Sequence, residues 1–167
     1  MELHMHSHHY VRRSPDWTAA AVSGLAAGAL LLVLELFWST MVSGVNPWGT
    51  TRMIAAILMG RDVLQTSLFS VGTVAAALVI HFVLGAVLGM VLAVIIAPFQ
   101  LDSSIRMILL AGAVFGLAVY LFDFHVMTRF FTWFVDARGW HTLVGHMIFG
   151  MVAAVSYWKL ESKDVSH

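Results

Sequence analysis

Hydrophobic and polar positions divide the chain into four long apolar stretches, separated by short segments that carry most of the charge. The stretches run over residues 17–42, 69–97, 105–124 and 140–158, and Pro98 ends the second. A bilayer core of roughly 30 Å needs about 20 apolar residues in a helix, so each can span a membrane. No period-two alternation typical of barrel strands occurs. The pattern predicts an all-α integral membrane protein with four transmembrane helices.

Composition supports this class and narrows the chemistry. Hydrophobic residues make up 60% of the chain and charged residues 11%, against about 25% charged in soluble domains. Basic and acidic residues balance at nine each, which disfavours a nucleic-acid partner. The absence of cysteine excludes disulfides, thiolate metal sites and cysteine nucleophiles. No phosphate-binding loop or nucleophile elbow occurs, so we expect no enzyme.

Four spans place both termini on one side of the membrane. That side carries five basic residues and the other carries four, so the positive-inside rule predicts cytoplasmic termini. Tryptophans near the span ends mark the two interfaces. The five basic residues are Arg12, Arg13, Arg106, Lys159 and Lys163, and the four are Arg52, Arg61, Arg129 and Arg138.

The two external connections contain apolar residues. Residues 51–64 combine isoleucines and leucines with charges and predict a short amphipathic helix at the surface. Residues 127–139 mix aromatic residues with arginine, which favours interfacial anchoring. Further small residues, Gly44, Gly60 and Gly72, indicate either self-association into a homo-oligomer or simple turns. The resulting division is a tail over 1–16, a first hairpin over 17–97, a second over 105–158 and a tail over 159–167.

An internal repeat relates the two hairpins. The first and third spans share the pattern Gly-x3-Gly-x6-acid, and the second and fourth share His-x3-Gly-x3-small. Because the motifs occur in the same order in both hairpins, they predict a pseudo-two-fold axis along the membrane normal. The alternative is that the match is a coincidence, since glycines are common in membrane helices. The matched residues are Gly24, Gly28 and Glu35 with Gly112, Gly116 and Asp123, and His81, Gly85 and Gly89 with His146, Gly150 and Ala154.

The spacing places the acids and histidines on the same helix faces as the glycines. Small-residue stripes mark where membrane helices pack closely, so these groups point into the bundle. At 1.5 Å rise per residue they lie about 6–10 Å outward of the glycines. We therefore expect a polar pocket in the outer half of the bundle. Its lining is Glu35, His81, Asp123 and His146, with Tyr120, His125 and His141 nearby and Arg52 and Arg129 at the entrance.

Two carboxylates and two imidazoles suit several roles. They are ligands for a divalent metal ion, or groups that carry or sense protons. Haem ligation by His81 and His146 is less favoured beside two carboxylates. The alternative is structural: Glu35–His81 and Asp123–His146 pairs that only hold helices together, in a non-catalytic accessory or assembly subunit. The tail residues His4, His6, His8 and His9 also have a composition typical of metal-binding tails.

Several short motifs lie over residues 79–158. They are His81 on a Gly/Val-rich span, Leu110-Ala111-Gly112-Ala113, an aromatic connection ending near Trp140, and Gly145-His146 before an apolar run. In these the chain resembles the YagU-type family of small bacterial inner-membrane proteins. The resemblance implies a location in the bacterial inner membrane. It implies no substrate, because that family has no assigned biochemical activity.

Overall fold

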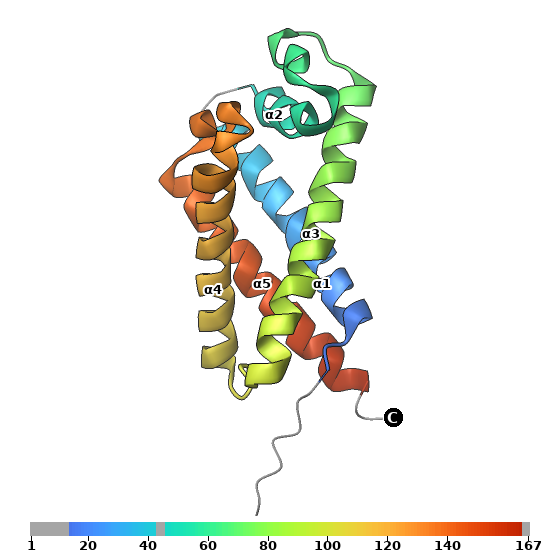
Figure 1. Cartoon of the computed structure of the whole chain (residues 1–167), viewed down its shortest axis with the longest axis vertical. Coiled ribbons are helices and arrows are strands. Elements are labelled where there is room, and N and C mark those ends of the chain that lie inside the picture. The colour runs from blue at the N-terminus through green and yellow to red at the C-terminus, as the bar shows by residue number, and fades with distance from the viewer. Residues whose placement is uncertain (1–13, 43–45, 165–167) are drawn as a thin grey trace, which may run out of the picture.

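The computed structural model describes residues 14–42 and 46–164. Four long helices form the bundle in Figure 1, and the described residues contain no strand. These helices are α1 (Trp17–Phe37), α3 (Val71–Phe99), α4 (Ile105–Leu121) and α5 (Trp140–Asp164). Each belongs to a segment long and apolar enough to cross a membrane. The predicted all-α, four-span architecture is confirmed.

The two ends of the bundle differ in structure. Figure 1 shows the start of α1, the α3–α4 turn and the end of α5 at one end. The opposite end carries α2 (Trp48–Met59), the 3-10 helix η2 (Arg61–Gln65) and the α4–α5 connection. The two long connections therefore lie on one side, because successive spans run in opposite directions. We call this side the outer end.

Side-chain caps fix where three of the helices begin. Asp16, Ser70 and Ser104 each accept a hydrogen bond from the backbone N–H three residues on, at 2.9, 3.4 and 3.3 Å. One predicted boundary was wrong, because α3 continues through Pro98 to Phe99, and Gln100 caps it with a φ of 51°. A proline in the last turn removes only one hydrogen bond of the helix, so the helix tolerates it there.

The first connection is a helix with a break in it. The predicted helix over residues 51–64 begins earlier, at Trp48, and ends at Met59. Gly60 follows with φ 86°, a conformation that favours glycine, so it forms a turn. Ala55 and Ala56 are buried, and the Trp133 indole donates to the Met53 carbonyl at 3.0 Å. Helix α2 is thus fastened to the second connection; Gly44 lies outside the described residues.

Both outgoing helices widen into a π-helix at their outer ends. Helix α1 passes into η1 (Trp38–Val42), and α4 passes into η3 (Phe122–Val126). The acids lie beside these segments, Glu35 just before η1 and Asp123 within η3. Such wide turns inside helices are often found at functional sites.

Glycines bring the helix backbones of each hairpin into contact. A Cβ on Gly24 would overlap the carbonyl of Gly85 in α3, and one on Gly112 would overlap the carbonyl of Gly150 in α5. Between hairpins, α1 packs along α5, whereas α3 and α4 make few contacts. A two-fold axis would make these two contacts equivalent. The structure repeats the packing within each hairpin but not the packing between them.

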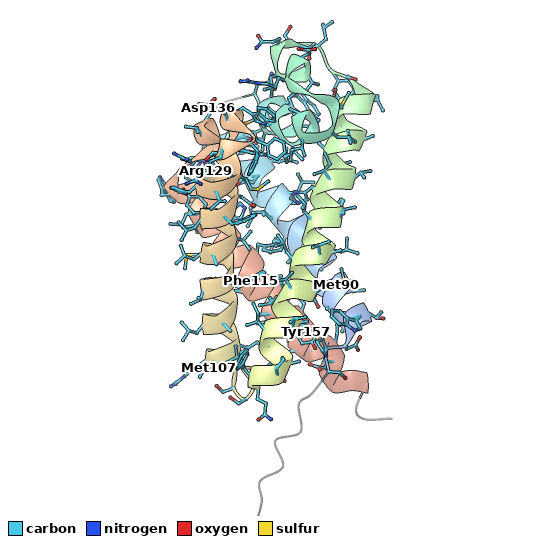
Figure 2. All side chains as sticks on the ribbon, in the orientation of Figure 1. Met90, Met107, Phe115, Arg129, Asp136 and Tyr157 are labelled. Atoms are coloured by element: carbon cyan, nitrogen blue, oxygen red, sulfur yellow. The ribbon has the colours of Figure 1, made fainter. Side chains whose placement is uncertain are left out.

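Large apolar side chains cover the outside of the bundle. Figure 2 shows them projecting along the whole length of the helices. Val33, Val79 and Leu110 are each 60% exposed, in positions where a soluble protein would carry polar residues. The core inside them contains small residues and a few large ones such as Leu92 and Tyr157. Lipid is the solvent that this surface fits.

Candidate functional site

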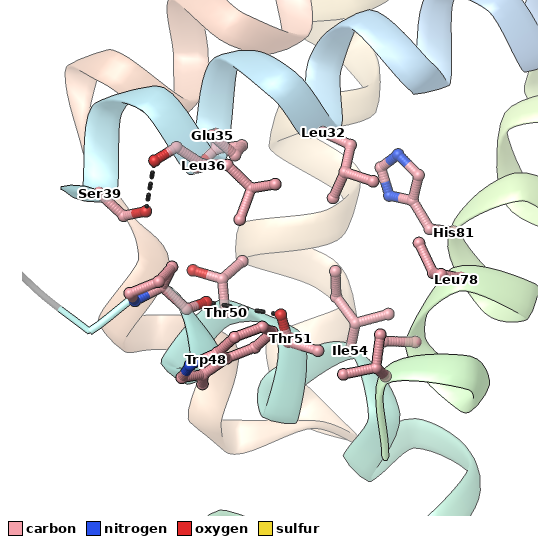
Figure 3. A pocket seen from close by; sticks show the side chains of 13 residues that line it. Leu32, Glu35, Leu36, Ser39, Trp48, Thr50, Thr51, Ile54, Leu78 and His81 are labelled. Atoms are coloured by element: carbon pink, nitrogen blue, oxygen red, sulfur yellow. Dashed lines mark hydrogen bonds between the residues drawn. The ribbon is translucent and has the colours of Figure 1, made fainter. Parts of the chain in front are cut away.

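A pocket of about 90 Å³ opens at the outer end, between α1, α2 and α3. Glu35 and His81 both line it, as Figure 3 shows, whereas Asp123 and His146 do not. The predicted pocket in the outer half therefore receives two of its four expected residues. Its wall is otherwise mostly apolar, with three hydroxyls. The remaining lining is Leu32, Leu36, Ser39, Pro47, Trp48, Thr50, Thr51, Ile54, Val74, Ala77 and Leu78.

His81 joins the two helices of the first hairpin. Its Nε2 lies 2.8 Å from the backbone carbonyl of Gly28 in α1. Because a carbonyl only accepts hydrogen bonds, Nε2 carries the proton and donates it. In the neutral imidazole Nδ1 is then an acceptor. His81 does not pair with Glu35, although the sequence had suggested a Glu35–His81 pair that holds the helices together.

Glu35 faces α5 as well as the pocket. A Cβ added to Gly145 would lie 3.5 Å from its Oε1, which places the carboxylate against that helix. His141, one turn earlier in α5, is close enough to interact electrostatically with it. The His141 ring stacks on Trp38 with centroids 5.3 Å apart and an interplanar angle of 6°. Glu35 therefore connects the pocket with the outer end of the second hairpin.

His146 is buried and faces an acid. Its Nδ1 lies 2.8 Å from the carbonyl of Thr142, one turn earlier in its own helix. That carbonyl only accepts, so Nδ1 carries the proton. Nε2 lies 3.8 Å from Oδ2 of Asp123, whose side chain is 41% exposed while that of His146 is 11% exposed. A lone pair and a carboxylate therefore face each other, and a proton on either group turns this repulsion into attraction.

The predicted peripheral residues have different surroundings. Tyr120 is buried and packs against His125 and His146, with ring centroids 5.8 and 6.1 Å apart. Arg52 lines a smaller second hollow between α2 and the start of α3. Arg129 is exposed, and nothing in the described structure places it at the mouth of the pocket.

Sequence reasoning missed Arg138 and Thr142. Arg138 Nε donates to the carbonyl of Phe124 at 2.5 Å, and its Nη2 donates to Thr128 Oγ1 at 3.1 Å. It thus ties the second connection to the π-helix that carries Asp123. The backbone carbonyl of Thr142 sets the tautomer of His146. Because every residue type has such a carbonyl, the sequence carried no signal for this contact.

The structure does not assemble the expected metal site. In residues 14–42 and 46–164 no three histidine, aspartate or glutamate side chains gather as metal ligands. The physical reason is that His81 is bound to α1, while Asp123 and His146 pair within the second hairpin. The histidines of the N-terminal tail lie outside the described residues.

A haem between His81 and His146 does not fit either. The space beside the glycines near these histidines is filled by the backbone of the facing helix. A Cβ on Gly116 would already overlap the His146 carbonyl, and one on Gly89 would overlap the Ala20 carbonyl. In addition, the protonated Nε2 of His81 is used by Gly28. Two axial nitrogens are therefore not presented to a common iron.

Comparison of the chain with models of protein families, with curated proteins and with solved structures finds no match. The resemblance to the YagU-type family stays a prediction.

Proposed function

We propose that this chain is a small, non-enzymatic protein of the bacterial inner membrane that binds and releases protons in the outer half of its bundle. The observation that supports it is the Asp123–His146 pair, with Nε2 and Oδ2 3.8 Å apart. With Nδ1 committed to Thr142, one proton between the two groups satisfies both. Ionisable groups inside spans are costly, so such an arrangement points to a functional role.

Three further residues extend the site. His81 is near enough to His146 for the two imidazoles to interact electrostatically. Glu35 and His141 form a second acid–imidazole contact nearer the outer end. Below them the helix backbones of each hairpin meet at glycines, so the helices pack more closely there. We therefore expect proton exchange with the outer face rather than conduction through the bundle.

The test is a pH titration of the ¹⁵N-histidine spectrum of the full chain in lipid nanodiscs. The proposal expects the Asp123–His146 pair to take up a proton as the pH is lowered, which changes the ring-nitrogen signals of His146. It also expects Asp123→Asn to move that titration while leaving the fold intact. A His146 signal that is unchanged by Asp123→Asn would sink the proposal.

The second candidate is an accessory or assembly subunit whose polar groups only fix helix packing. The hydrogen bond from His81 to Gly28 favours it, because that bond joins α1 to α3. In this case His81→Gln and His146→Gln would reduce function only as far as they reduce stability. A folded double variant without function would contradict the accessory role.

The proposed orientation places both termini in the cytoplasm. It is supported by the excess of basic residues on that side, five against four. Fusions of alkaline phosphatase and green fluorescent protein to each terminus test it. Fluorescence without phosphatase activity at both ends is expected, and the opposite result would reverse the orientation.

A further inference from the structure

We propose that the pocket between α1, α2 and α3 binds the ammonium group of a small organic amine. This goes beyond the proton site: the pocket shares Glu35 and His81 with the outer part of that site, but the binding does not require Asp123 or His146. The argument rests on the hydrogen-bonding character, the charge and the size of the pocket.

The polar groups of the pocket mostly accept hydrogen bonds. The Ser39 hydroxyl donates its proton to Leu36 O at 3.1 Å, and that of Thr51 points to Pro47 O at 3.5 Å (Figure 3). The proton on Nε2 of His81 is directed to Gly28, which leaves Nδ1 as an acceptor in the neutral ring. The pocket therefore offers lone pairs, and its remaining side-chain donors are the hydroxyl of Thr50 and the indole N–H of Trp48.

The only acidic side chain on the wall is that of Glu35. None of the 13 described lining residues is lysine or arginine. His141 is the imidazole that interacts with Glu35, and its ring is stacked on Trp38 rather than hydrogen-bonded to the acid. The ring of Trp48 adds an aromatic face, which attracts cations. A cation that donates hydrogen bonds is thus the complementary ligand.

The apolar part of the wall determines the size and polarity of the rest of the ligand. Leu32, Ile54 and Leu78 surround the space beside the carboxylate, as Figure 3 shows. A cavity of about 150 Å³ lined by such residues holds benzene, so the 90 Å³ here suits a head group and a few carbons. Leu36, Trp48 and Leu78 are 36–39% exposed, which leaves the pocket open at its edge. A short alkylammonium fits with its tail toward that opening.

The experiment measures binding of n-butylammonium to the full chain in nanodiscs, by saturation-transfer NMR and titration calorimetry, with empty nanodiscs as background. Neutral butanol and anionic butyrate are the matched probes. We expect saturable binding of butylammonium that Glu35→Gln weakens about 10- to 100-fold, as loss of a charged hydrogen bond does. Asp62→Asn, which removes an exposed acid outside the pocket, leaves binding unchanged.

A second variant keeps the test independent of the charge. Ile54→Trp fills the pocket from α2 and must abolish binding, while thermal unfolding shows that the bundle is intact. The proposal is overturned if butylammonium does not bind, if butanol binds equally well, or if binding survives Ile54→Trp. It is also overturned if Glu35→Gln binds as tightly as the unchanged chain.

Discussion

The two hairpins carry the same motif but use their histidines differently. In the first, His81 lies between the helices and donates to Gly28 of α1. In the second, His146 turns along its own helix to Thr142 and faces Asp123. The spacing of the backbones explains the difference. A Cβ on Gly28 would lie 3.7 Å from the His81 ring, whereas one on Gly116 would overlap the His146 backbone.

Close backbone contact thus decides the chemistry of the histidine. Where the helices are slightly further apart, the imidazole fits between them and becomes a structural bridge. Where the backbones touch, it is displaced toward the outer end and meets the acid. Four predictions test or sharpen this comparison.

The largest expected effect separates Gly116→Ala from its counterpart Gly28→Ala. The first forces a methyl group into the α5 backbone and should cost about 3 kcal/mol of unfolding free energy, at the upper end for overpacking. The second meets only ordinary van der Waals contact and should cost less than about 1 kcal/mol. Detergent-induced unfolding followed by tryptophan fluorescence measures both. Equal losses would refute the difference in helix spacing.

The next effect concerns the arginine that holds the second hairpin's π-helix. Arg138→Gln removes the bond to the Phe124 carbonyl and should cost about 1.5–3 kcal/mol, as for other charged hydrogen bonds. Arg129→Gln is the matched control, because Arg129 is exposed, and it should stay within about 0.5 kcal/mol. Should both variants behave alike in the same unfolding assay, Arg138 does not clamp this segment.

A smaller effect compares the two histidines. His81→Leu removes a hydrogen bond between helices, and such bonds in membranes are worth about 0.6–1.7 kcal/mol. His146→Leu removes one within α5, so it should destabilise the bundle less. Unfolding free energies of the two variants decide this, and a greater loss for His146→Leu would reverse the assignment of roles.

The smallest effect is on metal content. Because the described residues bring no three metal ligands together, the protein without residues 1–13 should carry far less than one transition metal per chain. Elemental analysis after purification on an affinity tag free of histidine measures this. A full equivalent that disappears in the His81/His146 double variant would restore the metal hypothesis.

Much of the architecture could be predicted, because span length and turn position are local properties of the sequence. The four helices and the shared side of the two connections follow from apolar runs of sufficient length. The path of α3 through Pro98 could not be read, since a proline in the last turn costs little. The two π-helices were not predicted either, and η3 is contacted by a residue from the next connection, through the bond from Arg138 to Phe124.

The site was predictable only as a set of residues. Spacing placed Glu35 and His81 near one pocket, and these two do line it. Spacing could not predict which groups the two histidines contact. Gly28 and Gly116 are the same residue type at the same repeat position, and they differ only in how closely the neighbouring helix approaches. That distance depends on the packing of whole helices, which no local pattern records.

The glycine contacts of the inner half have an electrical consequence. A layer of touching helices supports more of the voltage across a membrane than a segment that water enters. Moving one charge through the whole membrane potential involves about 2.3 kcal/mol per 100 mV. In the proposed orientation, a proton that reaches Asp123 from the outer end would cross only a small part of that field. We therefore expect the site to report the external pH almost equally in energised and de-energised cells.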